Sequence, residues 1–430
     1  MEIYINPPEE RWESLSKRPA LDASSLTAAV NDIMRSVATG GDRQLLEYTR
    51  KFDGVALEQL QVSASEIKSQ AALVNEELKK AIQVAANNIG TFHKAQKHEP
   101  LKVTTSKGVS CWRKQLPIKR VGLYVPGGTA PLFSSLLMLG LPAKIAGCET
   151  IVVCTPPNAE GTIAPEIAYC CQLLELDTVF KAGGAQAIAA MTFGTQTIPK
   201  VDKIFGPGNQ YVTRAKELSL DYGLAIDMPA GPSEVLVIAD SNSRPEFVAA
   251  DLLSQAEHGS DSQVILVGDN LNQLETIIEV VKEEVELLPR AEMAKASLKN
   301  SKAFCFEKMN TCMDFSNVYA PEHLILALDD AEYWAEQVEV AGSVFIGNYT
   351  PESAGDYASG TNHTLPTNGY ARQYSGVSLD SFVNKVTFQQ LSKEGIRELG
   401  PVIEKMAAAE GLQAHKNAVS VRLKSLSDES

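Results

Sequence analysis

The feature that most constrains the fold is a repeated order of strand, turn and helix in the middle of the chain. Short apolar segments beginning near Arg120, Thr150, Thr178 and Lys203 each lead into a turn rich in glycine or proline, and then into a stretch with helical spacing. Strands that alternate with helices pair in parallel, because each crossover helix returns the chain to the same edge of the sheet. We therefore expect a doubly wound parallel sheet that binds ligands at the carboxyl ends of its strands.

A second, looser alternation follows residue 234. Its strands are expected at 235–239, 263–267, 303–306 and 342–347. The early helical segments, 26–48 and 64–97, can be assigned to this second unit, which would make the middle repeat an insertion. The tail from about residue 392 has helical spacing with breaks at Gly400-Pro401 and near Gly411. Because this tail has little core of its own, we expect it to dock on the body or on a partner subunit.

The predicted fold class is α/β, with two doubly wound, incomplete Rossmann-like domains, a helical N-terminal segment and a helical C-terminal tail. A chain of 430 residues is too long for one ordinary core, so several domains are expected. The expected boundaries are an N-terminal segment at 1–20, a discontinuous first α/β domain at 21–123 and 235–377 with the metal and substrate site, an inserted Rossmann-like α/β domain at 124–234, and a dimerising tail at 378–430.

Composition excludes several classes of protein. The net charge of −14 argues against a general nucleic-acid-binding surface, which needs a basic face. No apolar run approaches the roughly 20 residues that span a bilayer, and the N-terminus lacks the pattern of a signal peptide. The seven cysteines form no C-x-x-C pair, which suits a reducing cytoplasm. We expect a cytoplasmic protein with no nucleic-acid or membrane partner.

The stretch from Asp251 to Gly259 has the pattern of the end of an amphipathic helix, with Ser243 as a plausible N-cap. Gln255 and His258 are three residues apart, so on a helix the amide and the imidazole point the same way. The spacing alone fits either half of a metal site or a polar helix end.

Two further segments carry polar groups that can do chemistry. Glu322-His323 lies in a turn that enters a strand. The two side chains act jointly only in a loop conformation, and a hydrogen-bonded turn histidine is the structural alternative. The turn-rich loop 355–369 has no apolar periodicity, and so long a loop inside a compact domain is typical of a binding segment. In this loop Asp356 is a candidate metal ligand and His363 a candidate substrate contact.

The remaining histidines lie near charged residues. Glu410 and His415 belong to the tail, where Gly411 permits a break that turns both side chains inward; taken singly, both would be surface residues. His93 and His98 fall in a charged stretch and are expected on the surface.

Four of these polar residues form a mixed nitrogen and oxygen ligand set without a thiolate: Gln255, His258, Asp356 and His415. Two imidazoles favour Zn²⁺ or another late divalent metal over Mg²⁺ or Ca²⁺. The nucleotide fingerprint is weaker, since the stretch from Gly206 to Tyr211 has only two of the three glycines of G-x-G-x-x-G.

Seven segments taken together closely resemble the histidinol dehydrogenase family, in the same order and over essentially the whole chain. The segments are Leu123-Tyr-Val-Pro-Gly-Gly128, Gly183-Gly-Ala-Gln186-Ala, Gly206-Pro-Gly-Asn-Gln-Tyr-Val212, Gly231-Pro-Ser-Glu234, Ser254-Gln-Ala-Glu-His258, Ala320-Pro-Glu-His-Leu324 and Gly355-Asp-Tyr-Ala-Ser-Gly-Thr-Asn-His363. The resemblance implies a Zn²⁺-dependent, NAD⁺-linked, four-electron oxidation of L-histidinol to L-histidine through the aldehyde, which is the last step of histidine biosynthesis.

The resemblance also implies roles for individual residues. Glu322 and His323 match the catalytic acid–base pair. The implied ligands of one Zn²⁺ per subunit are Gln255, His258, Asp356 and His415. The implied nucleotide contacts are Tyr124, Gln186 and Asn209. The implied substrate contacts are Ser233, His363 and Glu410, together with His323 and the metal ligands. The family is homodimeric, with Glu410 and His415 matching contributions of the tail to the active site of the partner.

Other functions stay open at this point. A related zinc- and NAD-dependent dehydrogenase could oxidise another small alcohol on the same scaffold. A zinc-dependent hydrolase would use a carboxylate-activated water without a nicotinamide, and it would turn over with no absorbance change near 340 nm. A non-catalytic binding protein would have no use for Glu322-His323 beside the ligand set.

Overall fold

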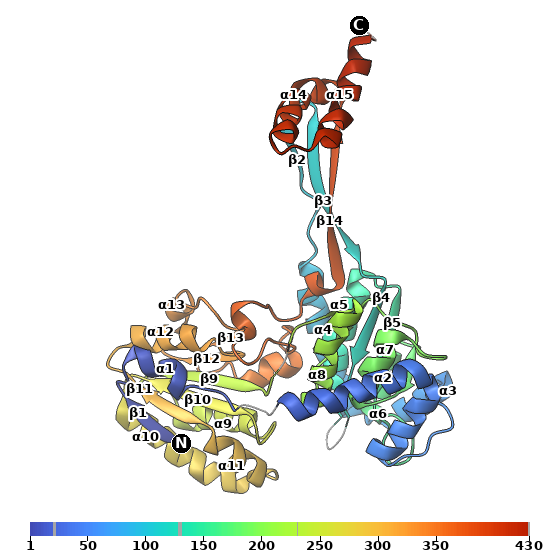
Figure 1. Cartoon of the computed structure of the whole chain (residues 1–430). Coiled ribbons are helices and arrows are strands. Elements are labelled where there is room, and N and C mark those ends of the chain that lie inside the picture. The colour runs from blue at the N-terminus through green and yellow to red at the C-terminus, as the bar shows by residue number, and fades with distance from the viewer. Residues whose placement is uncertain (20–22, 128–130, 230, 429–430) are drawn as a thin grey trace. The chain divides into compact units, whose positions relative to one another are not determined.

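The computed structural model describes residues 1–19, 23–127, 131–229 and 231–428, so Gly128 of the first resemblance segment lies outside the described residues (Figure 1). The chain forms two compact units. The first comprises residues 1–95 and 118–382, and the second comprises residues 96–117 and 383–430.

A five-stranded parallel sheet forms one half of the first unit, in the order β6-β5-β4-β7-β8. The strands are β4 (Arg120–Tyr124), β5 (Thr150–Thr155), β6 (Val179–Lys181), β7 (Lys203–Phe205) and β8 (Ala225–Ile226). The intervening helices are α5 (Phe133–Ala146), α6 (Pro165–Leu173), α7 (Gly184–Phe193) and α8 (Gln210–Ser219). In chain order the arrangement is 3-2-1-4-5, which confirms the predicted doubly wound sheet and puts its switch point between β4 and β7.

A six-stranded parallel sheet repeats this order with one strand added at the edge: β1-β11-β10-β9-β12-β13. The strands are β1 (Glu2–Ile5), β9 (Glu234–Ala239), β10 (Gln263–Gly268), β11 (Lys302–Cys305), β12 (His323–Ala327) and β13 (Ser343–Ile346). The helices are α1 (Trp12–Leu15), α9 (Pro245–Ala256), α10 (Leu271–Glu284), α11 (Ala291–Lys299), α12 (Met309–Tyr319) and α13 (Ala331–Ala335). Its switch point lies between β9 and β12.

Both faces of the six-stranded sheet are buried. Val235 and Val237 of β9 pack into one apolar cluster, and Leu236 and Ile238 pack into another on the opposite face. Continuous apolar strands of this kind are typical of parallel sheets covered by helices on both sides. None of the helices in the described part of the chain is long and apolar enough to cross a membrane.

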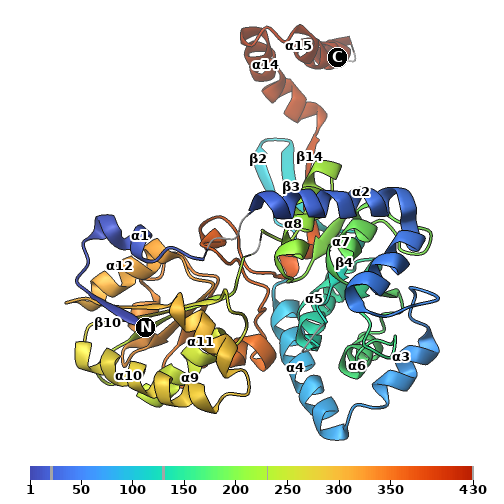
Figure 2. The same cartoon turned by 60° about the horizontal axis from the view of Figure 1, so that its bottom comes forward.

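The early helices cover the five-stranded sheet. These helices are α2 (Ala23–Tyr48), α3 (Ala64–Ala71) and α4 (Glu76–Ala95). Helix α2 packs on α7 and α8, α3 on α6, and α4 on α5 (Figure 2). This packing differs from the expected domain of 21–123 with 235–377, because the middle repeat carries the N-terminal helices with it. Helical periodicity identified their buried faces but not the sheet that those faces meet.

The second unit is a three-stranded antiparallel sheet followed by two helices. Its strands are β2 (Lys102–Ser106), β3 (Val109–Pro117) and β14 (Val383–Leu391), and its helices α14 (Lys393–Ala409) and α15 (Gln413–Asp428) pack on each other. The expected helical tail at 378–430 therefore contains a nine-residue strand, β14, ahead of its two long helices. The expected break at Gly400-Pro401 is wrong because α14 continues through it, whereas Gly411, with φ +72°, separates α14 from α15.

Single-turn helices complete the described structure. They lie at Glu9–Arg11, Thr49–Asp53, Leu220–Tyr222, Val285–Leu287, Ala354–Ala358, Tyr370–Arg372 and Leu379–Phe382.

Candidate active site

The amino ends of β9 and β12 hold the predicted acid–base pair. Glu234 begins β9, and its backbone N–H donates to Glu322 Oε2 over 2.9 Å. The carbonyl oxygen of the same residue accepts from Nδ1 of His323, the first residue of β12, over 3.1 Å. Because a carbonyl can only accept, the proton of the neutral imidazole resides on Nδ1 and Nε2 keeps its lone pair. The sheet register thus orients both side chains.

The adjacent residues Glu322 and His323 do face the same site, as joint action requires. Ala320, in the left-handed conformation at φ +56°, turns the chain out of α12, and Glu322 lies before the strand rather than in it. His323 Nδ1 is 3.6 Å from Glu322 Oε2, and both side chains are buried.

Two more carboxylates surround His323. Its Nε2 atom lies 3.6 Å from Asp356 Oδ1, and its Nδ1 atom lies 3.7 Å from Oε1 of Glu352. Glu352 was not predicted from the sequence. It is 1% exposed, and neither of its oxygens has a hydrogen-bond partner in the described structure.

The electrostatics of this cluster are those of buried acids around one imidazole. Burial raises the pKa of Glu322 and of Glu352 to about 8. Burial alone would lower the pKa of His323, but the carboxylates of Glu352, Glu322 and Asp356 raise it well above its ordinary value. Several acids sharing a buried site favour the binding of a cation, since a divalent ion would offset their mutual repulsion.

Three of the four predicted metal ligands lie in the first unit. Gln255 is the penultimate residue of α9, and its buried amide has neither Oε1 nor Nε2 hydrogen-bonded in the described structure. His258 lies just beyond the helix and is exposed as a residue. Protein atoms nevertheless shield its ring from water, and this desolvation of the charged form lowers its pKa. The Asp356 carboxylate counteracts the lowering of the His258 pKa, and the His258 imidazole contributes to the lowered pKa of Asp356. A bare amide oxygen, an imidazole and a carboxylate fit a zinc site in chemistry.

A second combination of side chains also has the spacing of a metal site. One atom each from His323, Glu352 and Asp356 lies within 4.8 Å of the others, and Asp356 belongs to this group and to the predicted ligands. The interpretation of Gln255 and His258 as one helical turn needs a correction. Helix α9 ends at Ala256, and His258 follows in a turn in which its N–H donates to the Gln255 carbonyl over 3.2 Å.

The expected N-cap of α9 is also wrong. Arg244 occupies that position, and the hydroxyl of Ser243 donates to the carbonyl of Asp240 instead.

The predicted binding loop is ordered by its own polar contacts. His363 Nδ1 lies 2.9 Å from the carbonyl of Asp356, and its Nε2 lies 3.1 Å from the hydroxyl of Ser135 on α5. Asn362 donates to the Met138 carbonyl over 2.6 Å and lies 3.4 Å from His93 Nε2. His93 was predicted on the surface because its neighbours in sequence are charged. This prediction is wrong, since His93 is fully buried beneath the loop.

The predicted nucleotide residues gather at the carboxyl ends of the five-stranded sheet. Tyr124 ends β4, and its hydroxyl accepts from the N–H of Gly184 over 3.0 Å, at the start of α7. The Gln186 amide borders the same glycine. Asn209 is the N-cap of α8, where its side-chain oxygen accepts from two backbone N–H groups. These residues therefore follow the rule for doubly wound sheets, whereas Glu322-His323 lies at the amino ends of its sheet.

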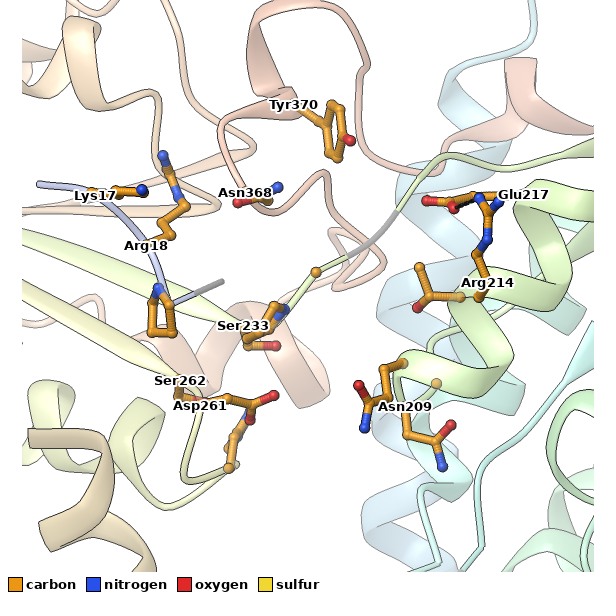
Figure 3. Close-up of a pocket in the computed structure, with 18 of the residues that line it drawn as sticks. Lys17, Arg18, Asn209, Arg214, Glu217, Ser233, Asp261, Ser262, Asn368 and Tyr370 are labelled. Atoms are coloured by element: carbon orange, nitrogen blue, oxygen red, sulfur yellow. Dashed lines mark hydrogen bonds and ion pairs between the residues drawn. The ribbon is translucent and has the colours of Figure 1, made fainter. Parts of the chain in front are cut away.

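A cavity of about 990 Å³ in the first unit is lined from both sheets (Figure 3). Asn209 and Arg214 of the α8 region face it from one side, and Ser233, just before β9, lies on the other. His258 also lines this cavity. Ser233 is thus placed on the same cavity as one predicted metal ligand.

Glu410 and His415 lie in the second unit. Glu410 is the C-cap of α14, His415 is in the first turn of α15, and both are exposed. The predicted ligand set is therefore divided between the two units.

Comparisons with known proteins agree over the whole chain. The family model described as histidinol dehydrogenase matches residues 16–423. The histidinol dehydrogenase of Bacteroides thetaiotaomicron is 54% identical over 426 residues, covering 99% of this chain and 100% of the relative. That of Escherichia coli strain K12 is 51% identical over 424 residues, covering 98% and 96%. A crystal structure of histidinol dehydrogenase from Elizabethkingia anophelis matches with a TM-score of 0.97 and 55% identity, covering 99% of both chains.

Proposed function

Because the chain belongs to the histidinol dehydrogenase family, we propose that it oxidises L-histidinol to L-histidine with NAD⁺ and one Zn²⁺ per subunit. The observation that carries this proposal is that the backbone of one residue, Glu234, hydrogen-bonds both Glu322 and His323. This pair supplies a base and a water-activating carboxylate in one buried site, and the unpartnered, buried amide of Gln255 offers a metal ligand.

The residues that would hold the metal are Gln255, His258 and Asp356 of one copy, with His415 as the fourth. A bound Zn²⁺ would act as a template for the amine and imidazole nitrogens of histidinol. Asp356 is suited to this role because the nearby imidazoles of His323, His363 and His258 lower its pKa against the effect of burial. Glu352 would add a negative charge behind His323.

In the first half-reaction His323 acts as the base. Its Nε2 lone pair accepts the proton of the alcohol. A bound NAD⁺ would take the hydride from the carbon that bears this hydroxyl group, and the product is the aldehyde. The carbonyl of Glu234 keeps the Nδ1 proton in place, so the ring presents the same nitrogen at each turnover.

In the second half-reaction Glu322 acts on water. Its carboxylate, fixed by the Glu234 N–H, accepts a proton from water as the water oxygen adds to the aldehyde carbon. The aldehyde oxygen takes up the proton that His323 gained in the first half-reaction, which completes the hydrate and returns His323 to its neutral form. A second NAD⁺ would take the hydride from the hydrate while His323 accepts a hydroxyl proton, and the resulting carboxylic acid ionises to the carboxylate of L-histidine. The first half-reaction thus transfers one hydride and releases one proton. The second transfers one hydride and releases two protons, because the carboxylic acid that forms is ionised.

The dinucleotide is proposed to lie along the carboxyl ends of the five-stranded sheet. Tyr124, Gln186 and Asn209 would contact it there, and Ser233 and His363 would contact the substrate near the six-stranded sheet. Both nitrogens of His363 already have protein partners, so its contribution would include holding the Asp356 backbone in place.

We also propose a cytoplasmic homodimer in which Glu410 and His415 complete the site of a second copy. Mixing an inactive His258→Ala chain with an inactive His415→Ala chain should then restore part of the activity, because a hybrid dimer contains one intact site. Hybrid dimers that form but stay inactive would contradict the shared site.

The function is tested by assaying the purified protein for NADH formation with L-histidinol before and after chelation. We expect absorbance at 340 nm to rise only with metal present and to recover on addition of Zn²⁺. Turnover of another small alcohol in preference to L-histidinol, or metal-dependent hydrolysis without NADH, would contradict the proposal.

A further inference from the structure

We propose that Asp53 binds the hydroxyl groups of the adenosine ribose of the dinucleotide and thereby selects NAD⁺ over NADP⁺. This inference rests on the proposed function and adds a specificity-determining residue to it. No residue of the segment around Asp53 was singled out from the sequence.

The backbone places Asp53 at the carboxyl edge of the five-stranded sheet. Asp53 ends the single-turn helix Thr49–Asp53, and the chain then runs beside β6, where Val62 N–H donates to the Val179 carbonyl over 2.9 Å and Lys181 N–H donates to the Leu60 carbonyl over 2.7 Å. Gly183 follows β6 as the N-cap of α7, and a Cβ atom there would lie 3.4 Å from Asp53 Oδ1. The carboxylate therefore borders the first turn of α7.

The Asp53 carboxylate lacks the partners that a buried acid normally has. Its Oδ2 atom is enclosed and accepts no hydrogen bond in the part of the chain that the structure describes. Burial raises the pKa of Asp53 to about 6, and no neighbouring cation counteracts this effect. An enclosed acceptor without a donor is costly, and a ligand that brings hydroxyl groups would supply the missing donors.

The proposed nucleotide residues lie beside this carboxylate. The Tyr124 hydroxyl accepts from Gly184 N–H, and the Gln186 amide borders Gly184 as well. Asp53 borders Gly183, and the hydroxyl of Tyr124 meets the next residue, Gly184. Burial raises the pKa of Tyr124 to about 12, and the charge of Asp53 adds to this rise. Asp53, Tyr124 and Gln186 thus surround one turn of the chain.

This turn belongs to the adenosine end of the ligand rather than the nicotinamide end. The cavity that contains Ser233 and His258 is lined by Asn209 but by none of Asp53, Tyr124 and Gln186. Hydride transfer requires the nicotinamide to lie near the substrate residues. A dinucleotide that also contacts Tyr124 and Gln186 therefore places its adenosine beside these two residues.

The charge of Asp53 distinguishes a hydroxyl group from a phosphate. A helix N-terminus alone would attract a phosphate, but a carboxylate against the first turn of α7 repels one. Ribose hydroxyls can donate to both carboxylate oxygens, as they do to acidic residues in other dinucleotide-binding sheets. The 2′-phosphate of NADP⁺ would instead bring like charges together. The competing role is structural, in which Asp53 only complements the dipole of α7.

The test is a binding measurement on the zinc-loaded, full-length protein by titration calorimetry. The ligands are NAD⁺ and its analogue that lacks the adenosine 2′-hydroxyl, and the proteins are the wild type, Asp53→Ala, Asp53→Asn and the control Glu58→Ala, an exposed acid on the same segment. We expect the wild type and the control to bind the analogue about tenfold more weakly than NAD⁺. Asp53→Ala should bind the two ligands equally, and its ratio of kcat/KM for NAD⁺ over NADP⁺ should fall at least tenfold.

Two results would overturn the inference alone: wild-type protein that reduces NAD⁺ but binds both ligands equally, or an Asp53→Ala protein that still prefers NAD⁺ to the analogue. If the alanine variant does not fold, Asp53→Asn replaces it, because asparagine keeps the shape of the side chain but not its charge. Its ratio of kcat/KM for NAD⁺ over NADP⁺ should then fall relative to the wild type, and an unchanged ratio would overturn the inference. Wild-type protein that neither binds nor reduces NAD⁺ would instead overturn the proposed function, and this inference with it.

Discussion

The imidazole Nδ1 of His323 lies 3.1 Å from the backbone carbonyl oxygen of Glu234, across the pairing of β12 with β9. The bond joins the first residues of two neighbouring parallel strands, so the register of the sheet sets the tautomer of the base. The side chain of Glu234 is held in turn by Arg18, whose Nη2 lies 2.7 Å from Glu234 Oε1. The base is therefore positioned by paired strands of the sheet rather than by a loop.

The first prediction concerns the two half-reactions. Replacing Glu322 by Gln keeps an oxygen that can accept from the Glu234 N–H but removes the carboxylate that activates water. We expect oxidation of supplied histidinaldehyde to slow about 100-fold or more, while the first hydride transfer from L-histidinol slows less than about tenfold. Single-turnover absorbance at 340 nm separates the steps, and equal losses in both would contradict the role of Glu322.

The second prediction concerns the pH dependence set by Glu352. Its carboxylate, 3.7 Å from His323 Nδ1, stabilises the imidazolium and so raises the pKa of His323. The base is active only when neutral, so kcat/KM should rise with pH through a pKa above 6.5, the ordinary histidine value. Glu352→Gln should move this acidic limb to lower pH, and the exposed control Glu332→Gln should leave it in place. An unmoved limb in Glu352→Gln would show that Glu352 does not act on His323.

The third prediction concerns the turn after β7. Gly206 has φ +133°, and a Cβ atom there would lie 2.1 Å from the Tyr124 carbonyl oxygen. Gly206→Ala should lower the free energy of unfolding by about 3 kcal/mol and weaken NAD⁺ binding at least tenfold. Gly223→Ala is the matched control, since it also has a positive φ but nothing within 4 Å, and it should cost about 1 kcal/mol without affecting NAD⁺. Equal effects of the two substitutions would remove the close contact as the cause.

The fourth prediction concerns the ion pair that supports the same turn. Lys216 Nζ lies 2.5 Å from Asp227 Oδ1, and Asp227 Oδ2 accepts from Gly206 N–H over 2.8 Å, with both charged side chains buried. Asp227→Asn leaves the lysine charge buried without its partner and should cost about 3–5 kcal/mol of unfolding free energy. The same change at Asp202, whose pair with Arg120 is exposed, should cost less than about 1 kcal/mol. Denaturant unfolding measures both, and similar losses would refute the structural role of Asp227.

The architecture could be predicted from the sequence because the spacing of apolar residues within each short segment indicates whether it forms a strand or a helix. Strands that alternate with helices specify a parallel sheet, and the predicted doubly wound order is the order observed in both sheets. The placement of the N-terminal helices could not be predicted, since the apolar face of α2 is the same whichever sheet it meets. The strand β14 was missed because its burial pattern lacks the alternation of a half-buried strand.

The site was only partly predictable for a related reason. Tyr124 and Asn209 follow strands, so the rule that ligands bind at carboxyl ends locates them. Glu322 and Ser233 precede strands, and the rule would place them on the wrong edge of the six-stranded sheet. Glu352 has no local signal, because a glutamate next to a proline in a polar loop is ordinary until the fold buries it beside His323.

The central claim is that a single site carries out both oxidations, and counting its products tests that claim most directly. With limiting L-histidinol, excess NAD⁺ and the zinc-loaded enzyme, absorbance at 340 nm and amino-acid analysis give the NADH and L-histidine formed. We predict two NADH and one L-histidine for each L-histidinol consumed. One NADH per L-histidinol, with the aldehyde accumulating, would contradict the account.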